Sequence, residues 1–274
     1  MSIVCIGDFG KTGEGRTEVA NLIKTLSRDN DIKLILGLGD NIYPAGVQNA
    51  QDPQFQEKFE KPFSKLPKGL KFYNVLGNHD HRGDTQAQIE YSERSNRWKM
   101  YNHWYHFTKT IGNTRVGFYA MDTNLDELPF EMREKQQREI IDSLNSSKTA
   151  WNIVYGHHPY RSTGQHGDSF GELKALYDNV IATGKVHFIL AGHDHDQQLF
   201  TIRDTPTLIV SGTGSETRKV PQIFRLNGDL EYHSEALGVC LLRFSPSQVT
   251  VEFYDTSGAG TVKYSKKINK IEYT

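Results

Sequence analysis

Five short apolar runs in this sequence end in a glycine, and the residue after each glycine is of a type that commonly binds metal ions. These residues are Asp8, Asp40, Asn78, His157 and His193. A short apolar run closed by glycine is typical of a buried parallel strand that enters a loop. In open α/β sheets, binding sites assemble where the carboxyl ends of such strands meet, and glycine permits a tight turn at each junction. We therefore expect the five side chains to converge on one metal site.

The donor atoms at these junctions are carboxylate and amide oxygens and imidazole nitrogens, without a thiolate. Tyr43 follows Asp40 by three residues and His195 follows His193 by two, so each can face the same site as its neighbour. This donor set suits iron, manganese or catalytic zinc better than a structural zinc held by cysteines. Two ions about 3.5–4 Å apart can catalyse an in-line displacement at phosphorus, and Asp40 is the natural ligand to bridge them.

The elements that must position these side chains alternate between strand and helix over most of the chain. Sequence periodicity predicts helices at about 15–28, 53–60, 84–95, 130–144 and 170–182, and strands at 2–7, 32–37, 71–76, 103–109, 115–121, 151–155 and 186–191. Only strands are expected after that, at 197–202, 207–211, 238–244, 248–254 and 261–265. No low-complexity linker interrupts the chain, so we predict a single catalytic domain over residues 1–274.

Composition and charge argue against several classes of protein. The 274 residues are 36% hydrophobic, which is ample for a core, and their formal net charge is -1. A nearly neutral chain is not expected to bind nucleic acid or acidic membranes through bulk charge, and no apolar stretch approaches the roughly 20 residues of a membrane span. Cys5 and Cys240 each lie in a predicted strand and are expected to be buried thiols. No signal-peptide pattern precedes the first strand, so we expect a cytoplasmic protein as written, or a secreted or lysosomal one if a leader was removed.

The motifs around the candidate ligands resemble those of the calcineurin-like metallophosphoesterases. They are GDFG, GDNIYPAG, GNHD, VYGHHP and AGHDH. Within that superfamily the sequence is most similar to the purple acid phosphatases of the small, mammalian, tartrate-resistant type. The segments that carry this similarity are GNHDHRGDTQAQIEYSERSNRW, the HG of QHGDS, and RKVPQ. The first junction lacks the histidine that most of the superfamily carries there, and Tyr43 is positioned to replace it. The resemblance implies a four-layer α/β/β/α sandwich, in which two facing mixed sheets are flanked by helices.

The resemblance also implies a role for each candidate site residue. Ferric iron in the first site would be bound by Asp8, Asp40, Tyr43 and His195, and Fe(II), zinc or manganese in the second site by Asp40, Asn78, His157 and His193. His79 would contact the substrate phosphate and help to protonate the leaving group. His166 would contact the substrate or donate a proton at the rim of the pocket. His158 is not usual at its position in this subfamily, and a place behind the ligands or at the rim stays open for it.

We therefore expect a hydrolase of the acid phosphatase type, which cleaves phosphate monoesters by in-line attack of a metal-bound hydroxide on phosphorus. Its substrates would be small phosphomonoesters or phosphoproteins, and a monomer without nucleic-acid or membrane partners is expected. The loop MDTNLDELPF is short where the mammalian enzymes carry a longer loop that is cut on activation. Two alternatives stay open: a related phosphodiesterase or nucleotide phosphatase that shares the ligands, and a non-catalytic phosphate- or metal-binding module, against which the complete ligand set argues.

Overall fold

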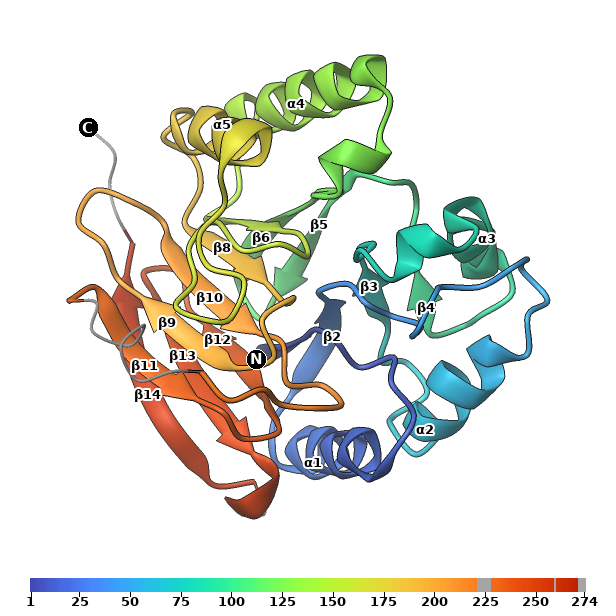
Figure 1. The fold of residues 1–274 in the computed structure, drawn as a ribbon. Coiled ribbons are helices and arrows are strands. Elements are labelled where there is room, and N and C mark those ends of the chain that lie inside the picture. The colour runs from blue at the N-terminus through green and yellow to red at the C-terminus, as the bar shows by residue number, and fades with distance from the viewer. Residues whose placement is uncertain (221–227, 259, 271–274) are drawn as a thin grey trace.

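The computed structural model describes residues 1–220, 228–258 and 260–270, and its strands form two seven-stranded sheets (Figure 1). The first sheet has the order β14 (Val262–Asn269), β13 (Gln248–Asp255), β12 (Gly238–Phe244), β1 (Ser2–Ile6), β2 (Ile32–Gly37), β3 (Phe72–Asn74) and β4 (Trp98–Lys99). Strands β1 to β4 are parallel, whereas β12, β13 and β14 pair in antiparallel register. This sheet is therefore mixed, with its parallel half supplying loops at one edge.

The second sheet repeats this arrangement. Its order is β11 (Leu230–Ser234), β9 (Gln197–Phe200), β10 (Thr207–Ser211), β8 (Phe188–Ala191), β7 (Trp151–Tyr155), β6 (Thr114–Ala120) and β5 (Tyr105–Ile111). Strands β6, β7, β8 and β10 are parallel, and β5, β9 and β11 are antiparallel to their neighbours. Strands β5 and β6 form a hairpin, which Gly112 turns with a φ of 68°.

Helices cover the outer faces of the two sheets (Figure 1). On the first sheet lie α1 (Glu14–Asp29), the π-helical turn η1 (Gln56–Glu60), α2 (Lys61–Phe63) and α3 (Thr85–Glu90), and on the second lie α4 (Phe130–Asn145) and α5 (Gly171–Ile181). Single 3₁₀ turns occur at η2 (Asp80–Arg82), η3 (Tyr91–Glu93), η4 (Leu125–Glu127) and η6 (Thr256–Gly258). The predicted α/β sandwich with two facing mixed sheets is confirmed.

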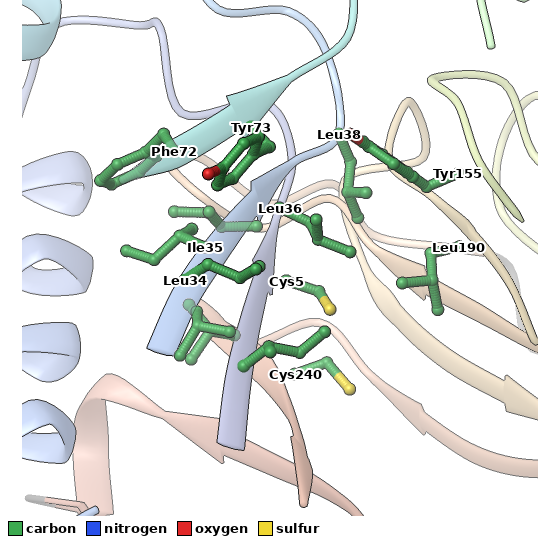
Figure 2. Packing of buried hydrophobic residues seen from close by; sticks show 14 of the residues in the cluster. Cys5, Leu34, Ile35, Leu36, Leu38, Phe72, Tyr73, Tyr155, Leu190 and Cys240 are labelled. Atoms are coloured by element: carbon green, nitrogen blue, oxygen red, sulfur yellow. The ribbon is translucent and has the colours of Figure 1, made fainter. Parts of the chain in front are cut away.

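The core fills the space between the two sheets. Figure 2 shows Cys5 and Leu36 of the first sheet on the side that faces Tyr155 and Leu190 of the second. All four side chains are fully buried, which fixes the distance and angle between the sheets and so the relative position of their loops. Cys5 lies opposite Cys240 across the β1–β12 pair, and both are free thiols as expected.

Several predicted boundaries differ from the structure. The helix expected at 53–60 begins at Gln54 and continues through Phe63, and the one expected at 84–95 ends as an α-helix at Glu90 and continues as a 3₁₀ turn. Strands β4 and β11 were not predicted, because β4 has two residues and β11 is a half-exposed edge strand without an apolar run. Among the described residues, none of the helices has the length and apolar character required to cross a membrane.

Candidate metal centre

The candidate ligands lie in five loops, each at the carboxyl end of a parallel strand. Asp8, Asp40 and Asn78 follow β1, β2 and β3 of the first sheet, and His157 and His193 follow β7 and β8 of the second. Because the two sheets pack face to face, the loops of both meet at one edge of the sandwich. Each sheet therefore supplies part of the site.

The junction glycines act differently from the prediction. Of the five, only Gly39 has a positive φ, at 86°. The ligand residues Asp8, Asp40 and His193 have left-handed conformations themselves, with φ values of 58°, 52° and 68°, which is uncommon for residues other than glycine and is typical of functional sites. The glycines are required for space instead, since a Cβ on Gly77 would lie 2.2 Å from Oδ1 of Asp40.

Three of the donors predicted for the first site form a tight group. The Tyr43 hydroxyl donates to Oδ1 of Asp8 at 3.0 Å and lies 3.2 Å from Nε2 of His195, which lies 3.3 Å from the same carboxylate oxygen. Donor atoms that bind one metal ion at about 2.0–2.2 Å lie roughly 3 Å from one another. The spacing of the group therefore fits a single ion.

The chemistry of this group also requires a cation. Burial, followed by the negative charges of Asp8 and Asp40, raises the pKa of the Tyr43 phenol far above its ordinary value. Two buried carboxylates and a buried phenol are costly to hold together without positive charge, and a bound cation reverses this by favouring the phenolate. The residues present thus fit a highly charged metal ion.

The donors predicted for the second site form a neighbouring group around His157. Its Nδ1 donates to the carbonyl oxygen of Leu38 at 2.8 Å, so Nε2 is the ring nitrogen that faces the site. Nε2 lies 3.1 Å from Oδ1 of Asn78 and 3.2 Å from Nδ1 of His193. Burial, followed by the charges of His157 and other nearby histidines, lowers the pKa of His193 well below its ordinary range, so it is a neutral imidazole that can bind metal.

Asp40 lies between the two groups. Its Oδ1 is 3.5 Å from Nε2 of His157, and potential ligand atoms of Asp8, Asp40 and His157 lie within 4.8 Å of one another. Burial raises the pKa of Asp40, but the charges of His157 and His79 outweigh burial and hold it below its ordinary value. An ionised, buried carboxylate between two donor groups has the position expected of a bridging ligand.

The two histidines expected to act on substrate lie beside this centre. Nδ1 of His79 donates to the carbonyl oxygen of Pro44 at 2.7 Å, which leaves Nε2 facing Asp40 with 3.9 Å between Nε2 and Oδ2. Its ring centroid lies 4.3 Å from that of Tyr43. The ring of His166 lies 4.1 Å from that of His193, and its Nε2 accepts a hydrogen bond from Arg218 at 3.0 Å. His79 and His166 thus lie next to different donor groups.

His158 lies behind the second group. Its Nδ1 contacts Oγ1 of Thr123 at 2.9 Å and its ring centroid is 4.4 Å from that of His193. Burial, followed by the charge of His157, lowers the pKa of His158 to about 3. Its nitrogens lie close enough to those of His157 and His193 to form a three-histidine group, so it is near the metal position as well as the rim.

Two buried carboxylates hold the ligand loops. Asp80 accepts backbone N–H bonds from Asn41 and Ile42, in the loop that follows β2, and from Gly77 beside Asn78. Burial, followed by the charge of Asp40, raises the pKa of Asp80 to about 6. Asp194 accepts from the Ser162 hydroxyl and from the backbone N–H of His166. Both carboxylates thus hold backbone segments next to the candidate ligands and His166.

A further cluster was missed by the sequence reasoning. The buried Asp122, which follows β6, accepts at Oδ2 from Nε2 of His81 at 2.9 Å and from Nδ1 of His103 at 2.8 Å. These three side chains also have donor atoms close enough to hold a metal ion. The sequence signal was weak, because no glycine precedes Asp122 and its partners lie in two other segments. The cluster ties the loop that carries Asn78 to the second sheet.

A cavity of about 650 Å³ opens beside the second donor group. Its lining includes the candidate ligands Asn78 and His193, and the rest of the lining comes from residues 123–127, 158–159 and 166–173 with Arg133. The short loop after β6 forms one wall, and the segment with His166 forms another. A volume in this range accommodates a small-molecule ligand.

Comparison with known proteins identifies the class. The model of the calcineurin-like phosphoesterase family matches residues 1–197. The chain is 32% identical to tartrate-resistant acid phosphatase type 5 of Sus scrofa over 301 residues, covering 96% of this chain and 86% of that protein. It is 28% identical to purple acid phosphatase 4 of Arabidopsis thaliana, covering 96% and 83%.

Solved structures agree on the fold. The purple acid phosphatase PPD1 from yellow lupin seeds superimposes with a TM-score of 0.72 at 18% identity, over 98% of this chain and 53% of that one. GAP50, described as the anchor in the inner membrane complex of Plasmodium, superimposes with a TM-score of 0.89 at 23% identity, over 99% and 89%. At these identities the likeness concerns the fold alone.

The chain therefore belongs to the calcineurin-like phosphoesterase family. Within that family its sequence relatives include tartrate-resistant and purple acid phosphatases, as the motifs predicted, and the prediction of a hydrolase of the acid phosphatase type is confirmed. The family is one of binuclear metal phosphatases, and the groups of potential ligands agree with this. Which residue binds which ion stays a prediction.

Proposed function

We propose that this chain hydrolyses phosphate monoesters at a two-metal centre held by the seven predicted ligands. The observation that carries the proposal is the convergence of two compact donor groups, one around Tyr43 and one around His157, on either side of Asp40. When bound, two such ions supply Lewis acidity and an activated water for in-line attack at phosphorus. The chain supplies the positions of the donors and the groups that surround the substrate.

We assign the first site to ferric iron and the second to Fe(II), zinc or manganese. The first group offers a carboxylate, a phenol and an imidazole at 3.0–3.3 Å from one another, with Asp40 nearby. A phenolate is a hard anionic donor, which favours a trivalent ion. The second group offers two imidazoles and an amide oxygen, a more neutral set that suits a divalent ion.

His79 is the residue best placed to deliver a proton to the leaving group. Its Nδ1–H is held by Pro44, so the ring is fixed and Nε2 is the nitrogen that can carry and release a proton. Arg82 places Nη1 of its guanidinium 3.2 Å from the same Nδ1. A guanidinium can only donate, so Arg82 cannot accept the Nδ1 proton, and the shorter contact to the Pro44 carbonyl at 2.7 Å determines that Nδ1 carries it.

His166 has a different environment. Because Arg218 donates to its Nε2, the proton of a neutral His166 lies on Nδ1. This arrangement suits contact with the substrate better than proton donation through Nε2. The proposed roles are therefore proton delivery for His79 and substrate contact for His166.

We propose small phosphomonoesters or phosphoproteins as substrates and a monomer as the active form, without nucleic-acid or membrane partners. The experiment compares p-nitrophenyl phosphate with bis(p-nitrophenyl) phosphate, using protein loaded with iron alone or with iron and zinc. Faster turnover of the monoester supports the proposal. Faster turnover of the diester favours the related phosphodiesterase, and metal binding without turnover of either favours a non-catalytic module.

A further inference from the structure

The cavity beside the second donor group has exposed acidic residues in its lining. They are Asp126, Glu127, Asp168 and Glu172, whereas the guanidinium of Arg133, which also lines the cavity, is paired with Glu172. Asp168 lies 3.9 Å from Nε of Arg161. Among the described residues, Asp126 and Glu127 form no salt bridge. Two carboxylates of the short loop after β6 are therefore available to a ligand in the cavity.

A second observation concerns an unpaired hydrogen-bond acceptor in the same wall. Asn124 lines the cavity and is only 5% exposed. Its Nδ2 donates to Oδ1 of Asp122 at 2.8 Å and to the carbonyl oxygen of Leu76 at 3.3 Å, so both amide hydrogens are used. Its Oδ1 is buried and has no donor among the described residues. A buried acceptor without a donor is costly, and this one belongs to a residue of the cavity wall.

Apolar residues also line the cavity. Leu125 and Phe170 contribute to the lining, and Phe170 is 84% exposed, which is unusual for an aromatic side chain of this size. An exposed ring in the wall of an acidic cavity can contact the methylene groups of a ligand and attract a cation to its face. The cavity thus combines a phosphate position near Asn78 and His193, apolar contacts and negative charge.

We propose that this cavity selects phosphate monoesters whose leaving group carries a primary ammonium, the simplest being O-phosphoethanolamine. The inference rests on the proposed phosphatase function and specifies its substrate class. The phosphate would lie at the metal centre, while the ammonium group would lie near the exposed carboxylates of Asp126 and Glu127. A zwitterionic substrate matches a site that combines the positive charge of bound metal ions with these carboxylates. A neutral or anionic leaving group gains nothing from the carboxylates.

The test compares O-phosphoethanolamine with propyl phosphate, in which a methyl group replaces the ammonium. The metal-loaded wild-type protein is expected to prefer O-phosphoethanolamine in kcat/KM by about fivefold or more, the scale of two partly exposed charge pairs. The double variant Asp126→Asn, Glu127→Gln is expected to lower this ratio to about the value that the two esters would have without charge interactions in the cavity. High salt is expected to lower the ratio in the same way. The ratio is measured within one protein sample, so a variant that folds incompletely does not change it.

Asp142→Asn provides the matched control, because Asp142 is exposed on α4 outside the cavity lining and its loss should leave the ratio unchanged. A wild-type ratio of one or less overturns the inference, and so does a ratio that the double variant does not lower. Turnover of p-nitrophenyl phosphate separates this failure from that of the proposed function. If the aryl ester is cleaved while the ratio fails, only the substrate class is wrong. If no ester is cleaved, both proposals fail.

Discussion

Replacement of Asp122 by asparagine tests the cluster that ties the Asn78 loop to the second sheet. The carboxylate is fully buried and accepts from two imidazoles, His81 at 2.9 Å and His103 at 2.8 Å. Asparagine keeps the shape but removes the charge. Breaking a buried charged pair by removing one partner costs about 3–5 kcal/mol, and asparagine retains one acceptor, so we expect a loss of about 3 kcal/mol in the free energy of unfolding.

The loss should depend on pH in a defined direction. Burial raises the pKa of Asp122, but its hydrogen bonds to His103 and His81 outweigh burial and hold it well below its ordinary value. This part of the stability is present above about pH 4 and is lost as pH falls through the folded-state pKa. Burial lowers the pKa of His81, but its hydrogen bond to Asp122 and nearby negative charges outweigh burial and raise it. This second part is present below about pH 6.5 and is lost as pH rises through the folded-state pKa.

Urea unfolding at pH 5.5 and pH 9 measures both effects. The difference between the wild type and Asp122→Asn should be larger at pH 5.5, where the aspartate is ionised and His81 is protonated, than at pH 9. Asp142→Asn, an exposed change on α4, should shift the free energy of unfolding by less than about 0.5 kcal/mol. Equal losses at the two pH values, or a loss for Asp122→Asn no larger than that of the control, would refute the reasoning.

Three further predictions concern the metal centre. Tyr43→Phe should fold and bind iron but lose the phenolate-to-iron absorption band of the oxidised protein, and a colourless iron-loaded wild type would contradict the assignment of Tyr43. His79→Ala should retain both metals and lose roughly 10²–10⁴-fold of its activity on alkyl phosphates but less on a nitrophenyl ester, and equal losses on both would assign His79 to phosphate binding. Gly77→Ala would place a Cβ 2.2 Å from Oδ1 of Asp40. It should lower the free energy of unfolding by about 1–3 kcal/mol and weaken metal binding, and unchanged metal content in dialysed protein would contradict this.

Much of the site could be predicted because its signals are local in sequence. Asp8, Asp40, Asn78, His157 and His193 each come within a few residues of the end of a strand, and the strand at 151–155 has the bounds that its apolar run predicted. Parallel strands present their carboxyl ends at one edge of a sheet, so the proximity of Asp8 and Asp40 followed from order along the chain. The proximity of His157 depends on the packing of the second sheet against the first. The extension of one domain over residues 1–274 stays a prediction.

The remainder depends on contacts between distant segments. Asp122 meets His81 and His103 across 41 and 19 residues, and nothing in the local pattern around any of the three indicates this contact. The tight turns were expected at the junction glycines, but Asp8 and His193 adopt the left-handed conformations themselves. Oδ2 of Asp8 accepts a hydrogen bond from the backbone N–H of His193 at 2.9 Å. Sequence alone does not show this close approach of the two loops. Strand β11 has no apolar run of its own and is defined by its pairing with β9.

The most direct test of the two-metal account is the metal content and activity of Asp40→Ala beside the wild type. Asp40 lies between the two donor groups, and its removal leaves the charge of both ions uncompensated. We predict two metal ions per wild-type chain with turnover of p-nitrophenyl phosphate, and for Asp40→Ala the loss of at least one ion and of nearly all turnover in protein that remains folded. Two ions per chain and retained activity in Asp40→Ala would contradict the account.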